Sequence, residues 1–134
     1  MKKLDIFTTR IVVESPLAGD FARNRRYAAW CCRAVAIREG AAAWCSQLYA
    51  PQFLDDRDEF ERAMGMAMTQ AFTTDEWEHW HFGDLGFSSG MLAALDKFPS
   101  RSHSSHSLAS YPAEWDGFQR GEWPPCTPGC EGIQ

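Results

Sequence analysis

The segment best suited to contacting a ligand is glycine-rich and runs from Gly83 to Gly90, with the sequence Gly-Asp-Leu-Gly-Phe-Ser-Ser-Gly. It follows an aromatic run over residues 77–82 and precedes a short helical pattern. Where a strand leads into a helix, the loop exposes backbone N–H groups and the helix dipole attracts anionic groups. The hydroxyls of Ser88 and Ser89 add hydrogen-bond donors. The segment predicts a ligand-binding loop, although a capped turn that binds nothing has the same pattern.

Carboxylates at the ends of predicted strands are the second group of candidates. Glu14 follows the β-branched run Ile11–Val13, and Asp84 follows the aromatic run. In these places a carboxylate can accept hydrogen bonds from ribose hydroxyls or, if its pKa is shifted, act as a general acid or base. Solvated carboxylates that cap a neighbouring helix have the same pattern, so both interpretations remain.

Glu61 and Gly65 lie four residues apart and therefore on one face of a predicted helix. A glycine within a helix costs about 1 kcal/mol relative to alanine, so Gly65 indicates close approach by a neighbouring helix or subunit. We expect a homo-oligomer on this basis. Glu61 joins Glu14 and Asp84 as a candidate for catalysis.

The histidines and cysteines do not form a recognisable metal motif. The four histidines come in two pairs with nothing to join them, His79 with His81 and His103 with His106. Cys126 and Cys130 offer two ligands where a structural zinc needs four. We expect no metal and no cofactor.

The elements that must position these residues alternate along the chain. Strands are predicted at residues 11–13, 41–49, 77–82 and 108–111. Helices are predicted at residues 21–39, 55–72 and 91–98, with Asp20 and Gly40 capping the first and an acidic start at Asp55 and Asp56 for the second. The alternation predicts a four- or five-stranded parallel sheet in a single Rossmann-like or flavodoxin-like α/β domain. Loops 14–20, 46–56 and 83–90 then converge at the carboxyl ends of the strands, where such sheets bind ligands.

Other regions are predicted from composition and spacing. Residues 100–107 are mostly serine, histidine and arginine and indicate a loop. The domain is expected over residues 1–111, and residues 112–134 are expected to be a tail held to the body by Trp115, Phe118 and Trp123. A stripe at helical spacing is predicted to be buried core, and comprises Phe60, Met64, Ala67, Met68 and Ala71.

Length and charge limit the classes of function. The chain has 134 residues, enough for one domain, and a net charge of −5. This balance argues against duplex nucleic acid as the partner, because neutralising phosphates drives such binding. Neither a long apolar run nor a secretory pattern is present, so we expect a cytoplasmic protein with no membrane contact.

Three motifs in order resemble phage and bacterial proteins related to nucleoside 2-deoxyribosyltransferases. They are Val13 to Asp20 followed by Arg23-Asn24, Leu54-Asp55-Asp56 with Glu61-Arg62 and Gly65, and Asp84 to Met91, which resembles an Asp-Leu-Gly-x-Ser-x-Gly-Met segment. The likeness covers about residues 11–98. It implies a Rossmann-like fold and a ligand-binding set of Glu14, Ser15, Pro16, Gly19, Asn24, Ser46, Gln47, Asp84, Gly86, Ser88, Ser89, Gly90 and Met91.

The chain also departs from that family. The family places a nucleophilic Glu near the start of the helix after the glycine-rich loop, where this chain has Ser89, Gly90 and Met91, and Gln47 stands where relatives often carry His after Ser. We therefore expect binding of a nucleotide or nucleotide-sugar without turnover, for instance by a phage protein of host cytoplasm that sequesters an ADP-ribose-type signal. The alternatives are a nucleoside or nucleotide N-glycosidase or deoxyribosyltransferase, and a protein–protein inhibitor.

Overall fold

A computed structural model describes residues 9–125 and contains one parallel sheet. Its strands are β1 (Arg10–Glu14), β2 (Ala42–Trp44), β3 (Glu78–Phe82) and β4 (His103–His106), in the order β2-β1-β3-β4. All three pairings are parallel. The prediction of a single Rossmann-like or flavodoxin-like α/β domain is confirmed.

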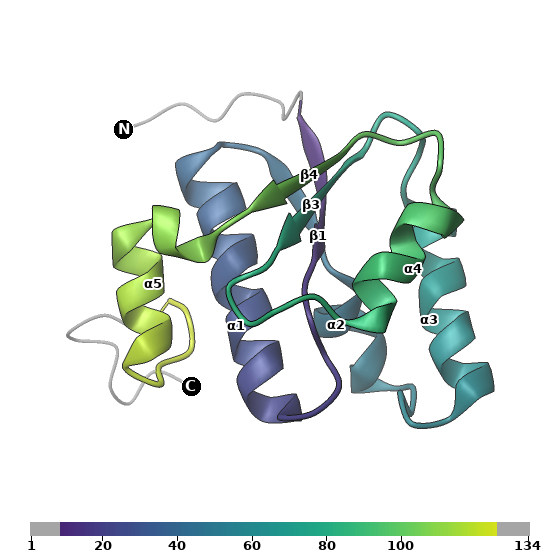
Figure 1. Cartoon of the computed structure of the whole chain (residues 1–134), viewed down its shortest axis with the longest axis horizontal. Coiled ribbons are helices and arrows are strands. Elements are labelled where there is room, and N and C mark those ends of the chain that lie inside the picture. The colour runs from purple at the N-terminus through teal and green to yellow at the C-terminus, as the bar shows by residue number, and fades with distance from the viewer. Residues whose placement is uncertain (1–8, 126–134) are drawn as a thin grey trace.

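Helices cover both faces of this sheet (Figure 1). Helix α1 (Phe21–Arg33), continued by a π-helical turn over Ala34–Arg38, and α5 (Pro112–Gln119) lie on one face. The other face carries α2 (Ser46–Tyr49), a 3₁₀ turn (Ala50–Gln52), α3 (Glu59–Phe72) and α4 (Ser89–Lys97). None of the helices in the described part of the chain is long and apolar enough to cross a membrane.

The sequence of β1 explains which of its side chains lie in the core and which lie on the opposite face of the sheet. Side chains alternate between the two faces of a strand. Ile11 and Val13 therefore pack in the core cluster under α1, together with Tyr27. Val12 and Glu14 belong to the other face, and Glu14 ends the strand at its carboxyl edge.

The predicted helices form, with one shifted start. Asp20 accepts a hydrogen bond from the Arg23 N–H at 3.2 Å, and Gly40 follows the π-helical turn with a φ of 64°. The second helix begins later than the pair Asp55–Asp56 suggested, because Asp58 is the residue that caps it, accepting from the Glu61 N–H at 2.9 Å.

One predicted strand is too long and another is wrong. Only Ala42–Trp44 of the span 41–49 is a strand, and Ser46–Tyr49 is helical. Residues 108–110 form a 3₁₀ turn, while the fourth strand is His103–His106, inside the segment expected to be a loop. Serine and histidine are not strong strand formers, but pairing with β3 and stacking of His106 on Trp80, with ring centroids 3.7 Å apart, stabilise this edge strand.

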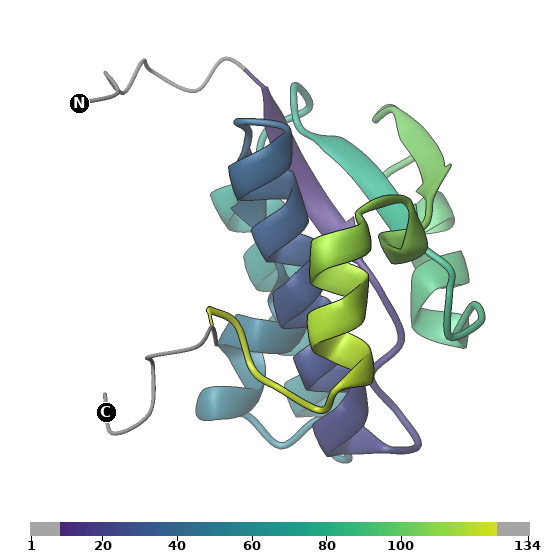
Figure 2. The ribbon, with the colours of Figure 1, turned by 90° about the vertical axis from the view of Figure 1, so that its left-hand side faces the viewer.

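Residues 112–119, expected to be the first part of a tail, form a helix, α5. Figure 2 shows α5 lying beside α1. Phe118 belongs to the core cluster and Trp115 packs against it, whereas Trp123 is 48% exposed. Cys126 and Cys130 lie outside the described residues.

The stripe expected to be core on α3 faces solvent. Phe60 is 71% exposed and Met64 is 41% exposed, while Gly65 and Thr69 form the buried face. A Cβ on Gly65 would lie 3.2 Å from the Ala50 Cβ, so the close approach that its glycine indicates comes from the same chain. This glycine therefore gives no support for an oligomer.

Candidate functional site

A cavity of about 600 Å³ opens at the carboxyl edge of the sheet. The chain leaves β1 toward β2 on one side and returns through β3 on the other, so β1 and β3 flank the switch point at which such sheets bind ligands. The cavity is lined by Glu14, Ser15, Leu17, Ala18, Ser46, Gln47, Ala50, Pro51, Leu54, Asp56, Glu59, Glu61, Arg62, Ala63, Gly65, Met66, Ser88, Ser89, Gly90, Ala93 and Lys97.

The three loops singled out from the sequence contribute to this single cavity. Seven of the expected ligand-binding residues line it, namely Glu14, Ser15, Ser46, Gln47, Ser88, Ser89 and Gly90. Glu61, a candidate for catalysis, lines it as well. The remaining six expected residues are not in its lining: Pro16, Gly19, Asn24, Asp84, Gly86 and Met91.

Several of these six support the loops. The Asn24 side-chain amide donates to the carbonyl oxygens of Leu17 and Ala18 at 3.2 and 2.9 Å, which holds the loop after β1. Gly19 and Gly86 adopt φ angles of 99° and 96°, a region where residues with a Cβ are strained. Such residues shape the loops without contacting the cavity.

Asp84 lies outside the cavity lining and has a structural role. Its carboxylate accepts hydrogen bonds from the Tyr27 hydroxyl at 2.6 Å, the Ser107 hydroxyl at 2.7 Å, and the N–H groups of Leu108 and Ala109 at 2.6 and 3.2 Å. Partial burial favours a higher pKa, but these bonds outweigh it and lower the pKa of Asp84. A carboxylate with so many donors joins β3 to the turn after β4 and is not free for a ligand.

Side chains of the loops also tie the cavity walls together. The Gln47 amide donates to the Ser15 carbonyl, and its oxygen accepts from the Cys45 thiol at 3.1 Å. The Ser46 hydroxyl donates to the Gly65 carbonyl at 3.4 Å. The cavity is therefore held in shape before any ligand arrives.

The start of α4 presents backbone donors to the cavity. The Ser88 hydroxyl caps the helix by accepting from the Met91 N–H at 3.2 Å. The N–H groups of Ser89 and Gly90 open the helix, where no intrahelical carbonyl is available to them. Ser15 lines the same cavity, and its buried hydroxyl has no hydrogen-bond partner among residues 9–125. Buried hydroxyls are nearly always satisfied, so this one is a candidate ligand contact.

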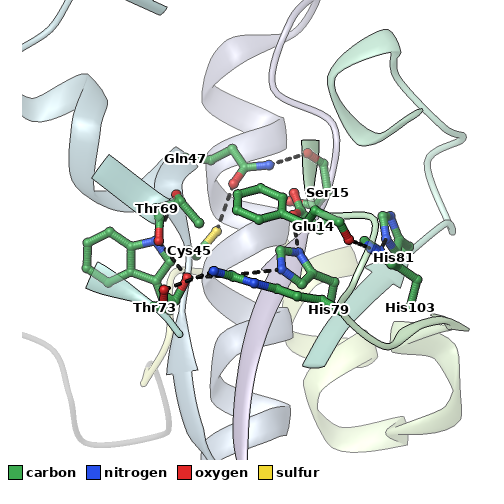
Figure 3. A network of polar contacts seen from close by, with 12 residues as sticks. Glu14, Ser15, Cys45, Gln47, Thr69, Thr73, His79, His81 and His103 are labelled. Atoms are coloured by element: carbon green, nitrogen blue, oxygen red, sulfur yellow. Dashed lines mark hydrogen bonds and ion pairs between the residues drawn. The ribbon is translucent and has the colours of Figure 1, made fainter. Parts of the chain in front are cut away.

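Glu14 is the most deeply set carboxyl group of the cavity, with a side chain 13% exposed. Its Oε2 lies 2.8 Å from His79 Nδ1, and His79 Nε2 lies 3.3 Å from the Arg101 guanidinium (Figure 3). Burial raises the pKa of Glu14 to about 8, opposed by the charges of His103 and Arg101. Burial also lowers the pKa of His79 to about 3.

Sequence reasoning missed His79 and Arg101 as parts of the site. Its spacing in the sequence groups His79 only with the other histidines. The signal that could have found it was its position on the same face of the predicted strand as His81. The parallel register places it there, pairing Val12 with His79 and Glu14 with His81. Arg101 lies in a segment expected to be a loop, and nothing in the local sequence indicates its burial.

The other histidines on this face bond to one another. His103 Nε2 lies 2.8 Å from the Phe98 carbonyl, which can only accept, so in the neutral ring Nδ1 accepts from His81 Nε2 at 3.0 Å. Burial lowers the pKa of His81 to about 4. Within residues 9–125, no group of three or more His, Cys, Asp or Glu side chains is placed to hold a metal ion.

Comparisons with known proteins give one match. The family model described as Domain of unknown function (DUF7768) matches residues 9–105, a range that contains every residue lining the cavity. No curated protein and no solved structure matches the chain. The likeness to nucleoside 2-deoxyribosyltransferases stays a prediction.

Proposed function

Because the chain belongs to the DUF7768 family, a domain of unknown function, we propose a function from its cavity: the protein binds a nucleoside- or nucleotide-like small molecule there. One observation carries the proposal. The loops after β1, β2 and β3 line a single cavity of about 600 Å³ at the switch point of a parallel sheet. Ligand cavities of proteins range from about 300 to 1,000 Å³, and open α/β sheets bind ligands at this place.

The lining indicates the chemistry of the ligand. Hydroxyl groups and the N–H groups at the start of α4 suit a sugar or one phosphate. The lining also contains the carboxylates of Asp56, Glu59 and Glu61 and the carboxyl group of Glu14, and its only cations are Arg62 and Lys97. A ligand with few negative charges fits this balance better than a triphosphate does.

Binding without turnover agrees with the residues of α4. This helix presents Ser89, Gly90, Ala93 and Lys97 to the cavity, and its carboxylate Asp96 is not in the lining. A glycosyl-transfer nucleophile must reach the anomeric carbon. The α4 wall therefore offers no such nucleophile, which supports release of the ligand unchanged by a protein that sequesters a nucleotide signal.

Calorimetry with nucleosides, nucleoside monophosphates and ADP-ribose tests this proposal, after mass spectrometry of the denatured protein for a co-purified ligand. Gly90→Glu should abolish binding, because it adds a carboxylate to the cavity wall. Gly90→Ala is the matched control and should bind normally, because the nearest atom to its new Cβ, the Ser88 Oγ, is 3.7 Å away. Equal affinity in Gly90→Glu, or no binding of any tested compound by the wild type, would contradict the proposal.

The position of Glu14 favours a second candidate function, hydrolysis of an N-glycosidic bond. Here Glu14 would donate its proton to the leaving base as the bond from C1′ to nitrogen breaks. Water would then add its oxygen to C1′ and return a proton to the Glu14 carboxylate, giving the free base and the sugar. Chromatography of ligand recovered after long incubation separates the candidates. A released base that disappears in Glu14→Gln supports hydrolysis, and intact ligand supports binding alone.

A further inference from the structure

Glu14 is connected through the buried interior to a second cavity, of about 490 Å³, near the amino ends of β3 and β4. The connection consists of His79, which is fully buried, and Arg101, which is 8% exposed and lines that second cavity. Figure 3 shows the side chains of Glu14 and His79 facing each other, and the Arg101 guanidinium lies 3.3 Å from the far nitrogen of His79, Nε2. Their hydrogen bonds decide where the protons lie.

Arg101 is held in one orientation. Its NH1 donates to the Thr73 hydroxyl at 2.5 Å, and its NH2 donates to the Thr73 carbonyl at 2.9 Å. The guanidinium also lies over the Phe98 ring, 4.4 Å from its centroid. Thr73 in turn donates its hydroxyl proton to the Thr69 carbonyl at 2.5 Å. The Arg101 Nε makes no hydrogen bond within residues 9–125, and the exposed Asp75 carboxylate lies 3.7 Å from it.

The guanidinium determines the tautomer of His79. An arginine has only donors, so the Nε2 that faces it at 3.3 Å must be an acceptor and carry no proton. The single proton of the neutral imidazole then lies on Nδ1, which donates to Glu14 Oε2 at 2.8 Å. His79 therefore gives Glu14 a hydrogen bond but no compensating positive charge.

The other charged groups around Glu14 do not supply a direct counter-ion. From α3 and the loop before it, Glu59, Glu61 and Asp56 line the cavity together with Arg62, and α4 contributes Lys97. From the sheet, His81 and His103 bond to each other. Arg101 contacts His79 and not Glu14. An ionised carboxylate that is largely buried and lacks a paired cation is strongly disfavoured.

We propose that Glu14, buried and without a paired cation, is a neutral carboxylic acid with its proton on Oε1, the oxygen that accepts no bond from His79, and that Arg101 is a positioning residue that keeps the proton of His79 on Nδ1. The inference rests on the proposed function for its purpose, since the cavity would then meet its ligand with a proton donor. The raised pKa of Glu14 agrees with it. A protonated carboxyl group at this place binds a ligand atom that accepts a hydrogen bond, such as a carbonyl oxygen or a ring nitrogen. It would not accept a hydrogen bond from a ribose hydroxyl through this oxygen.

The hydrogen-bonded row of Arg101, His79 and Glu14, which we call the relay, can be tested in the free protein without any ligand. In ¹⁵N spectra of histidine-labelled protein, His79 should show a protonated Nδ1 and an unprotonated Nε2 down to pH 5. In ¹³C spectra, the Glu14 Cδ, assigned by its loss in Glu14→Gln, should titrate with a midpoint above pH 7. A midpoint at or below 7, or an Nε2-protonated or doubly protonated His79, would overturn the proposal.

Arg101→Met tests the positioning role, with the half-exposed Arg120→Met as control. Without the guanidinium, the proton of the neutral imidazole can lie on Nε2, so the ¹⁵N spectra should lose the pattern of a protonated Nδ1 and an unprotonated Nε2. A His79 that keeps this pattern in a folded Arg101→Met would remove Arg101 from the relay. If this variant does not fold, the wild-type spectra still decide the proposal.

Ligand binding gives a further readout. Glu14→Leu has neither a donor nor an acceptor at this place, so it should bind at least tenfold more weakly than the wild type, and wild-type affinity should fall above pH 8. Equal affinity in Glu14→Leu, or wild-type affinity that does not change between pH 6 and pH 9, would contradict the donor role. Failure of every compound to bind would instead contradict the proposed function and leave the spectra as the test of the relay.

Discussion

Replacing Glu14 with glutamine should stabilise the folded protein at alkaline pH and change it little at pH 5. Glutamine has the shape of the protonated acid and keeps an oxygen for the His79 Nδ1–H. In the wild type the pKa of Glu14 rises from 4.5 to about 8 on folding. Between these values the folded state holds a proton that the unfolded state has lost, so the free energy of unfolding decreases as pH rises.

The magnitude follows from this linkage. Each pKa unit corresponds to about 1.4 kcal/mol, which over the interval amounts to roughly 5 kcal/mol. Entry of water around the ionised group reduces the penalty, so we expect Glu14→Gln to be more stable than the wild type by about 3 kcal/mol at pH 9 and by less than about 1 kcal/mol at pH 5.

Urea denaturation at pH 5, 7 and 9 measures this difference. Asp96→Asn on α4 is the control, because its side chain is exposed and does not line the cavity. Its stability should follow that of the wild type at every pH. A Glu14→Gln variant with no advantage over the wild type at pH 9 would refute the burial of an unpaired carboxyl at this position.

The acid side of the same profile has the opposite sign. Burial lowers the pKa of His79 to about 3 and that of His81 to about 4, whereas unfolded histidine titrates near 6.5. Between the folded and the unfolded pKa values, these histidines are protonated in the unfolded state and neutral in the folded state. The free energy of unfolding therefore falls as pH drops below 6.5. Wild-type stability should therefore be greatest near pH 6.5, and a profile that rises steadily toward pH 4 would contradict the neutral histidines.

Three further predictions concern the scaffold. Asp84→Asn should destabilise the protein by about 2 kcal/mol in urea denaturation, because an amide group would face donors that now bond a carboxylate. Gly117→Ala should destabilise by about 1 to 3 kcal/mol despite better helix propensity, because its Cβ would lie 2.5 Å from the Trp30 ring; a variant as stable as the wild type would show that this ring can move. Light scattering should show at least a dimer in the wild type, because the rings of Phe60 and Phe72 are more than half exposed and available for contact with a second copy. The double variant Phe60→Ser and Phe72→Ser should be a monomer, and a wild-type monomer would exclude a contact between copies through these rings.

Local sequence signals predicted the architecture well because they depend on neighbouring residues. The β-branched run of β1, the cap at Asp20 and the helix start after Ser88 are decided by interactions within a few residues. The alternation of strand and helix then implied the parallel sheet and its ligand-binding edge. Loops from three parts of the chain could therefore be assigned to one edge of the sheet from the order of residues alone.

Only the tertiary structure decided which polar side chains belong to that cavity and in which protonation state. Glu14 and Asp84 both end strands, yet one lies in the cavity wall without a counter-ion and the other accepts bonds from four donors. Glu14 meets His79 across 65 residues of sequence, and Arg101 is a further 22 residues away from that histidine. Burial and the hydrogen bonds of a neutral imidazole depend on how distant segments pack, and no local pattern encodes them.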